Sequence, residues 1–262
     1  MSGEEGNCGM ATWREVEIGG KRADLFVPAQ CRDPQNAVLF LHGHARITLK
    51  DNPVYTEQLE KHGLIAVCPY GERSWWGNRI CREFDENITP LAYLREQVLP
   101  WLDSEFAVQP PAIGLFGISM GGQGALRLSY AHPNEFPVVV ALSPIIDVQL
   151  LYGHGLPLDE MFPNAEAVRQ ETVVLHLHPL NWPRHQLLLC DPGDQDWFDG
   201  FDRLLGKLRS TGIPFEVDAT TRAGGHSWEY FDQQAPQVIS FLVERLEKER
   251  LRLPVANQPE PK

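Results

Sequence analysis

The chain of 262 residues carries a net charge of -12, and 43% of its residues are hydrophobic. This composition is typical of an ordinary globular protein that buries a substantial core. The acidic balance argues against a nucleic-acid partner, because phosphate binding needs a basic face. No apolar stretch approaches the roughly 20 residues of a membrane-spanning helix, and the first residues lack the basic start and apolar core of a signal peptide. We therefore expect a cytoplasmic protein with no membrane partner.

Strand-like and helix-like runs alternate along the chain from residue 13 to about residue 250. The runs 13–18 and 22–27 are separated by Gly19-Gly20, which predicts an opening β-hairpin. Further strands are predicted, in chain order, at 37–41, 64–68, 112–116, 138–143, 186–190 and 214–219. Helices are predicted between them at 54–62, 91–106, 123–131, 197–210 and 228–250. This order predicts an α/β fold, with an eight-stranded, mostly parallel sheet and helices on both faces.

The division into domains follows from what lies between these runs. Nothing before the C-terminus resembles an interdomain linker, so we expect a single domain over residues 1–252. The insert at 144–184 is rich in loops, with one short helix candidate at 165–171, and is too small and polar for the large lid of an interfacial lipase. Residues 253–262 contain three prolines, which predicts a disordered tail.

The most informative motif is the pentad Gly117-Ile118-Ser119-Met120-Gly121. It follows an apolar run and precedes a helical one, the context that a G-x-S-x-G nucleophile elbow requires. A serine at the tip of such a turn has a strained backbone, so the positions two before and two after it must be nearly free of side chains. Ser119 is therefore the candidate nucleophile. The alternative is a glycine-rich turn whose serine only caps the helix.

A serine needs a base to remove its proton, and nine histidines are available. Only His226 lies between the last predicted strand and the last predicted helix, where this type of site places its base. The preceding Gly224-Gly225 would let the backbone approach Ser119 closely. We therefore predict His226 as the base, against the alternative that it only caps a helix or packs in the core.

The base in turn needs a carboxylate, expected on the loop after the strand at 186–190. Four aspartates lie there: Asp191, Asp194, Asp196 and Asp199. Gly193 suggests a turn just past the strand end, with a carboxylate three residues further on, so we favour Asp196. Asp191 is the alternative, and surplus acids here could cap the next helix.

A tetrahedral intermediate also needs two backbone N–H donors. One is expected from Met120, the residue after the nucleophile. The other is expected from His44, because Leu41-His42-Gly43-His44 follows a predicted strand with a His-Gly turn. Trp75 and Trp76 follow the strand at 64–68, and they could wall the substrate pocket or simply pack in the core.

These segments together resemble the α/β-hydrolase family, within it the branch of esterase D, S-formylglutathione hydrolase and the secreted mycolyltransferases. The resemblance rests on five segments: 41–43, 69–71 with 74–76, 117–122, 190–198 and 224–228. It implies an α/β-hydrolase fold and a triad of Ser119, Asp196 and His226. No metal or organic cofactor is implied. The five cysteines contain no C-x-x-C pair, and the pair His176/His178 lacks a third ligand at metal-site spacing.

The sequence predicts a serine hydrolase that acts on a small-molecule ester or thioester of a short or compact acyl group, through an acyl-enzyme. Two alternatives stay open: acyl transfer to an alcohol by the same triad, and a catalytically silent binding domain that keeps the fold. The net charge of -12 should slow strongly anionic substrates, unless Arg73, Arg79 or Arg82 line the entrance and reverse the local field.

Overall fold

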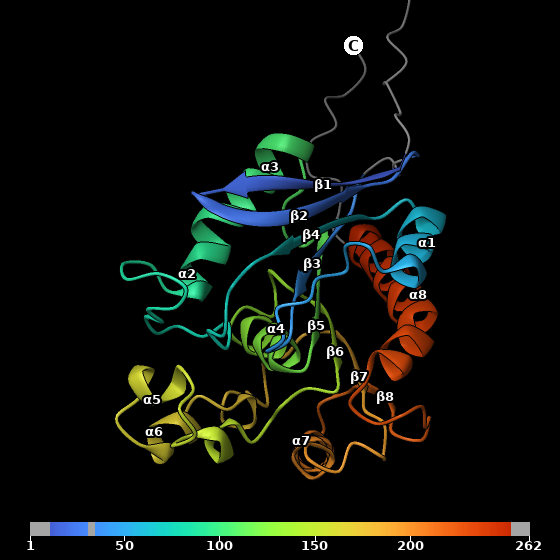
Figure 1. Cartoon of the computed structure of the whole chain (residues 1–262). Helices are drawn as coiled ribbons and strands as arrows, with labels where there is room; N and C mark the ends of the chain where they lie inside the picture. The colour runs from blue at the N-terminus through green and yellow to red at the C-terminus, as the bar shows by residue number, and fades with distance from the viewer. Residues whose placement is uncertain (1–10, 31–34, 253–262) are drawn as a thin grey trace, which may run out of the picture.

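The computed structural model describes residues 11–30 and 35–252. Eight strands form one sheet in the order β1-β2-β4-β3-β5-β6-β7-β8 (Figure 1). β1 pairs antiparallel with β2, and β2 with β4, whereas the other neighbours are parallel. The eight-stranded, mostly parallel sheet is therefore confirmed. The strands are β1 (Thr12–Ile18), β2 (Lys21–Val27), β3 (Ala37–Leu41), β4 (Ile65–Pro69), β5 (Ile113–Ile118), β6 (Val138–Leu142), β7 (His185–Leu189) and β8 (Glu216–Asp218).

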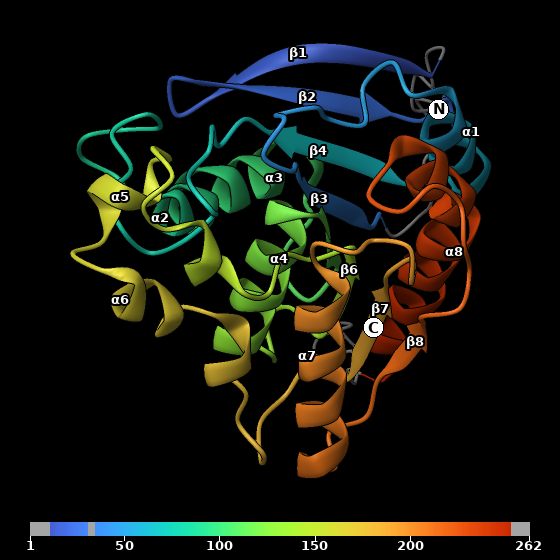
Figure 2. The same ribbon diagram turned by 60° about the horizontal axis from the view of Figure 1, so that its bottom comes forward.

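Helices cover both faces of this sheet (Figure 2). The helices are α1 (Pro53–His62), α2 (Pro90–Tyr93), α3 (Leu99–Phe106), α4 (Met120–Ala131), α7 (Phe198–Thr211) and α8 (Trp228–Arg252). One apolar cluster joins α1 and α8 to one face, and a second joins α2, α3, α4 and α7 to the other. Every residue of the central strands β3, β4, β5 and β6 is buried. Their uninterrupted apolar sequences are what a parallel strand covered on both faces requires.

The predicted helix at 91–106 is continuous but irregular. A π-helical turn, Leu94–Val98, separates α2 from α3. Pro100 lies just after this turn, and proline has no N–H to donate and clashes with the carbonyl four residues earlier. A π-turn relieves that clash by adding a residue to the turn. The predicted helix therefore continues past Pro100 by means of this wider turn.

The insert between β6 and β7 contains two 3₁₀ turns, Val148–Leu151 and Val173–Leu175, with α5 (Leu158–Met161) and α6 (Ala165–Arg169) between them. α5 and α6 lie on the side of the molecule opposite to α8 (Figures 1 and 2). Hydrogen bonds from Gln123 and Arg127 of α4 to Glu171 hold the insert against the main body. The tail predicted at 253–262 falls outside the described residues. Within the described ranges, no helix is long and apolar enough to cross a membrane.

Candidate active site

Ser119 lies at the tip of a sharp turn between β5 and α4. Its backbone has φ 60° and ψ -120°, a positive φ that costs a residue with a side chain of order 1–3 kcal/mol and that clusters at functional sites. The turn is held in place because the Ser119 N–H donates a hydrogen bond to the Leu142 carbonyl, 2.9 Å away. The strand, turn and helix predicted around the pentad are therefore all present, and the serine does not cap the helix with its side chain.

Two glycines make this turn possible because other backbone lies against them. A Cβ added to Gly117 would lie 2.0 Å from the Gly121 carbonyl oxygen, and one added to Gly121 would lie 1.8 Å from the oxygen of Leu41. Real Cβ atoms do not approach that closely, so neither position accepts a side chain. A Cβ on Gly43 would lie 3.1 Å from the Cβ of Ser119. The turn after β3 thus sits directly beside the candidate nucleophile.

His226 meets Ser119 across the end of the sheet. It follows Gly224 and Gly225, which have φ of 83° and 70°, values that glycine adopts at little cost. His226 Nε2 lies 2.9 Å from Ser119 Oγ, and His226 Nδ1 lies 2.6 Å from Asp194 Oδ2. Because a carboxylate only accepts, Nδ1 carries the proton and donates to Asp194. Nε2 is then free to accept the hydrogen bond that the Ser119 hydroxyl donates.

The carboxylate against His226 belongs to Asp194, so the prediction that Asp196 would take this place is wrong. The Asp194 side chain is 1% exposed. Asp196 is exposed, and no hydrogen bond or ion pair joins its side chain to another described residue. The structure therefore brings together Ser119, His226 and Asp194.

The error lies in where the chain turns after β7. The Asp191 carboxylate accepts a hydrogen bond from the Gly193 N–H at 2.6 Å, and the Asp194 N–H donates to the Asp191 carbonyl at 2.9 Å. This tight turn begins at the strand end, whereas the prediction began it at Gly193. Asp194 then accepts at its carbonyl from the Phe198 N–H, 2.9 Å away. The chain is entering α7 by residue 196, too late to reach the histidine.

Asp191, the alternative acid, holds the histidine loop rather than the histidine. Besides the Gly193 N–H, its carboxylate accepts from the N–H groups of Ala223 and Gly225, at 2.7 and 2.8 Å. Burial disfavours the ionised form, but these three backbone donors outweigh it and lower the pKa of Asp191 below its ordinary value. One carboxylate thus ties the loop that carries Asp194 to the loop that carries His226.

The two predicted oxyanion donors lie on either side of Ser119. Met120 is the first residue of α4, so its N–H is among the four amides that have no partner inside the helix. His44 follows Gly43 and lines the same cavity as Ser119. Both N–H groups therefore belong to the turns next to the serine hydroxyl, as the predicted role requires.

His42, which the sequence analysis gave no role, holds the turn that carries His44. Its buried ring donates from Nδ1 to the Gly43 carbonyl at 2.8 Å and accepts at Nε2 from the Gly71 N–H at 3.0 Å. Burial lowers its pKa to about 4, so the ring is neutral and can accept at Nε2. Its carbonyl accepts from Trp76 Nε1 at 3.1 Å. The only sequence signal for this role was the His-Gly pair after the strand.

The two tryptophans have different roles. Trp75 lines the cavity next to Ser119, as one of the two readings of the sequence expected. Trp76 does not line it. It is fully buried, with its ring against Gly71 and Gly124, where an added Cβ would approach within 2.4 and 2.5 Å. Trp76 therefore packs beneath the oxyanion turn.

The cavity at Ser119 has a volume of about 520 Å³ and mostly apolar walls. This volume is within the range of small-molecule sites. Most of its wall residues were not predicted from the sequence: Ile47, Ile145, Leu151, Leu156, Trp197, Trp228 and Phe231. They are apolar residues on loops and helix ends, and no sequence signal separates them from core residues. Among the described residues, no group of three or more His, Cys, Asp or Glu side chains is placed to hold a metal ion.

The sheet, the turn at Ser119 and the order of Ser119, Asp194 and His226 along the chain are those of the α/β-hydrolase fold. A protein-family model, Esterase ("Putative esterase"), matches residues 27–241. The chain therefore belongs to the Esterase family.

Curated relatives and solved structures agree with this family. S-formylglutathione hydrolase of Mus musculus is 28% identical over 109 residues, which span 35% of this chain and 39% of the mouse protein. Diacylglycerol acyltransferase/mycolyltransferase Ag85A of Mycobacterium tuberculosis is 23% identical over 214 residues, 68% of this chain and 63% of Ag85A. The chain thus spans less than two thirds of either relative's length.

The solved structures share the fold over nearly the whole chain. An S-formylglutathione hydrolase from Agrobacterium tumefaciens superposes with a TM-score of 0.75 at 18% identity, covering 94% of this chain and 99% of that one. The serine hydrolase FphF of Staphylococcus aureus gives 0.71 at 18% identity, over 90% and 99%. The resemblance to this branch and the α/β-hydrolase fold are confirmed.

Proposed function

We propose that the protein is a serine carboxylesterase or thioesterase that acts on short or compact acyl groups through an acyl-enzyme. The observation that carries this proposal is the unbroken hydrogen-bonded chain Ser119 Oγ, His226 Nε2, His226 Nδ1 and Asp194 Oδ2, with contacts of 2.9 and 2.6 Å. Nucleophile, base and orienting carboxylate stand within the reach that proton transfer needs.

The first half-reaction forms the acyl-enzyme. As Ser119 Oγ attacks the ester carbonyl, His226 Nε2 takes the hydroxyl proton, and Asp194 stabilises the imidazolium that forms. The carbonyl oxygen becomes an oxyanion, which the N–H groups of Met120 and His44 stabilise. Collapse of this intermediate breaks the bond to the leaving group, which receives the proton from His226 Nε2. In the second half-reaction, water gives its proton to His226 and attacks the acyl carbonyl, and Ser119 Oγ leaves as the hydroxyl.

The cavity supports a compact acyl group. Its volume is about 520 Å³, and Trp75, Trp197 and Trp228 line it. These large aromatic side chains present flat surfaces against which a compact or planar group can pack. We therefore expect acetyl to butyryl aryl esters to react with a higher kcat/KM than octanoyl esters, and a steady rise through dodecanoyl esters would contradict this.

Active-site labelling and an ester panel test the proposal. A fluorophosphonate should label the wild-type protein and the Ser104→Ala variant, which changes an exposed serine on α3, but not Ser119→Ala. Ser119→Ala and His226→Ala should each lower kcat for 4-nitrophenyl acetate by up to about a millionfold, with the double variant hardly worse. Labelling that persists in Ser119→Ala, or additive losses, would overturn the triad. A protein that takes no label and hydrolyses no oxygen ester or thioester would support a silent binding domain instead.

Acyl transfer is the second candidate. Ag85A, which aligns with 68% of this chain, is named a diacylglycerol acyltransferase/mycolyltransferase. The chemistry differs only in the last step, where an alcohol replaces water. Added alcohols should give little transacylated product if the protein is a hydrolase. Dominant ester formation at millimolar alcohol would favour the transferase.

A further inference from the structure

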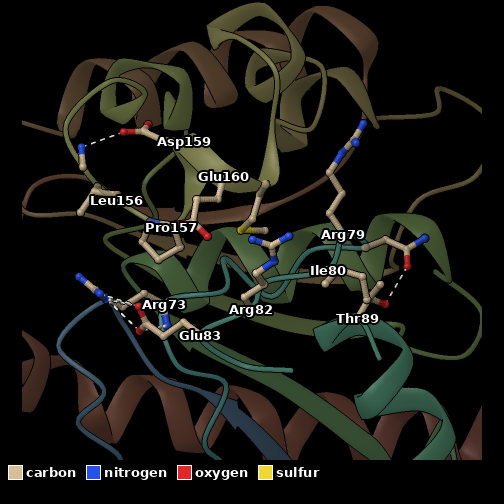
Figure 3. A pocket seen from close by; sticks show the side chains of 13 residues that line it. Arg73, Arg79, Ile80, Arg82, Glu83, Thr89, Leu156, Pro157, Asp159 and Glu160 are labelled. Atoms are coloured by element: carbon tan, nitrogen blue, oxygen red, sulfur yellow. Dashed lines mark hydrogen bonds and ion pairs between the residues drawn. The ribbon is translucent and has the colours of Figure 1, made fainter. Parts of the chain in front are cut away.

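A second cavity, more polar than the first, shares the lining residue Leu156 with the cavity at Ser119. Figure 3 shows the side chains that line it. It has a volume of about 1140 Å³ and opens between the loop that follows β4 and the part of the insert that leads into α5. Its charged lining residues are Arg73, Arg79, Arg82, Glu83, Asp159 and Glu160. All three arginines that could reverse the local field of this acidic chain thus face one space.

Two of these arginines already have carboxylate partners. Arg73 Nε donates to both carboxylate oxygens of Glu83 at 2.9 Å. Arg79 lies 3.8 Å from Glu171 and places its guanidinium over the ring of Phe162. Arg73 is therefore held by hydrogen bonds, whereas Arg79 has an ion-pair partner and a ring contact but no hydrogen bond among the described residues.

Arg82 is different. Figure 3 shows its guanidinium in the middle of the cavity, with the Glu160 side chain and Pro157 beside it. No hydrogen bond or ion pair joins it to any residue in the described parts of the chain, and Glu160 is not within ion-pair distance. Asp159 does not compete for it, because its carboxylate accepts from the N–H groups of Gly153 and Gly155 at 2.6 and 2.8 Å. A free guanidinium offers a planar fork of donors that matches a carboxylate.

The two cavities share a wall. Leu156 lines both the cavity at Ser119 and the cavity at Arg82. A third, small pocket is lined both by Trp75, which also lines the cavity at Ser119, and by Arg79, which also lines the cavity at Arg82. The Arg82 cavity therefore adjoins the cavity at Ser119 along Leu156.

We propose that the Arg82 cavity binds a carboxylate carried by the ester substrate, so that the enzyme prefers anionic esters to neutral esters of the same shape. This inference rests on the proposed esterase function. The carboxylate belongs either to the acyl group, as in a half-ester of a dicarboxylic acid, or to the leaving group. Glu160 on the facing wall weakens the local positive field and limits the preference.

Two matched substrate pairs separate the two sources. For the acyl side, the pair is mono-4-nitrophenyl glutarate and its methyl ester. For the leaving-group side, the pair is 3-carboxy-4-nitrophenyl acetate and the methyl ester of that carboxyl group. Each variant is compared with wild type on the same substrate, so differences in intrinsic reactivity cancel.

The variants are Arg82→Gln, Glu160→Gln and the control Arg14→Gln, an exposed arginine on the outer strand β1 that lines neither cavity. Because Arg82 is exposed, we expect Arg82→Gln to lower kcat/KM for one anionic ester about three- to fivefold, with its neutral partner unchanged. Glu160→Gln should raise the anionic rate by about twofold. Arg14→Gln should match wild type, and 0.5 M salt should shrink the preference.

The possible failures are distinguishable. If wild type hydrolyses the neutral esters but Arg82→Gln affects both members of each pair equally or neither, the carboxylate site is wrong and the esterase function stands. If wild type hydrolyses no ester, the proposed function fails. Calorimetry with glutarate then tests whether the Arg82 cavity binds a carboxylate. Weaker binding to Arg82→Gln than to Arg14→Gln would support the site, and equal or absent binding would overturn it.

Discussion

The nucleophile turn and the acid loop show two ways in which a sequence specifies a site. The turn that carries Ser119 was predicted at its observed place, because Gly117 and Gly121 are required by backbone atoms only a few residues away or in the adjacent strand. The acid was misplaced by two residues, although Asp194 and Asp196 have the same side chain. The residue types at the elbow are thus determined by steric contacts with nearby backbone atoms, which only glycine avoids.

The acid loop is a problem of tertiary hydrogen bonding. Four aspartates within nine residues are chemically equivalent in the sequence. The choice among them depends on the tight turn that Asp191 closes, and that turn is fixed by the N–H groups of Ala223 and Gly225, which lie more than 30 residues further along the chain. No local pattern encodes those partners.

The largest expected effect tests this difference at the acid loop. Asp194→Asn should lower kcat for 4-nitrophenyl acetate by about ten-thousandfold, because the wrong tautomer of the base is then favoured. Asp196→Asn, two residues away and exposed, should stay within about twofold of wild type. If Asp196→Asn is the crippling change, the geometry in which Asp194 contacts His226 is not the reactive one.

The second prediction tests the elbow. An alanine at position 121 would put its Cβ 1.8 Å from the Leu41 carbonyl oxygen, so Gly121→Ala should lower the free energy of unfolding by at least about 3 kcal/mol. Gly206 of α7 has no atom within 4 Å of an added Cβ. Gly206→Ala should therefore stabilise the protein by roughly 0.5–1 kcal/mol. Urea denaturation followed by circular dichroism measures both, and equal effects would mean that close backbone approach is not what selects glycine at 121.

The same division between local and tertiary control explains what the sequence predicted of the fold. β3 was predicted at its observed bounds because an apolar run between turn signals defines a buried strand. β8 is observed at Glu216–Asp218, shorter than predicted, because pairing with β7 ends there and its own residues are only half-buried or exposed. In the site, Ser119 and His226 lie at glycine-marked turns, whereas Leu156 and Trp197 reach the cavity through an insert and a loop whose paths depend on tertiary packing.

The third prediction sharpens the comparison at the residue that closes the acid loop. Asp191→Ala removes the acceptor of three backbone N–H groups and should cost about 3 kcal/mol of unfolding free energy at pH 7. The pKa of Asp191 is lowered in the folded state, so its stabilisation is present above its unfolded pKa of about 3.9 and is lost as pH falls through the folded pKa. The difference in free energy of unfolding between wild type and Asp191→Ala, measured by urea denaturation, should therefore be largest at pH 7 and smaller at pH 3.

Asp196→Ala is the matched control for that measurement, since it removes an exposed carboxylate from the same loop. It should leave stability unchanged at both pH values. A gap for Asp191→Ala that is independent of pH would indicate that packing, and not the ionised carboxylate, holds the loops together.

The smallest expected effect concerns the oxyanion turn, which shares features of both regions: its glycine is local, but His42 ties it to Gly71 on the neighbouring loop. His42→Asn should lower kcat about tenfold with little change in KM, less than the hundredfold or more that follows loss of an oxyanion donor.

The effect of His42→Asn on the free energy of unfolding should depend on pH. Burial lowers the pKa of His42 from 6.5 to about 4, so between these values the unfolded chain binds a proton that the native protein does not, and stability falls as pH falls. Wild type should therefore lose about 2 kcal/mol more than His42→Asn between pH 7 and pH 5. Parallel loss in the two proteins would mean that another histidine carries the dependence, and an unchanged kcat would show that Gly43 alone fixes the turn.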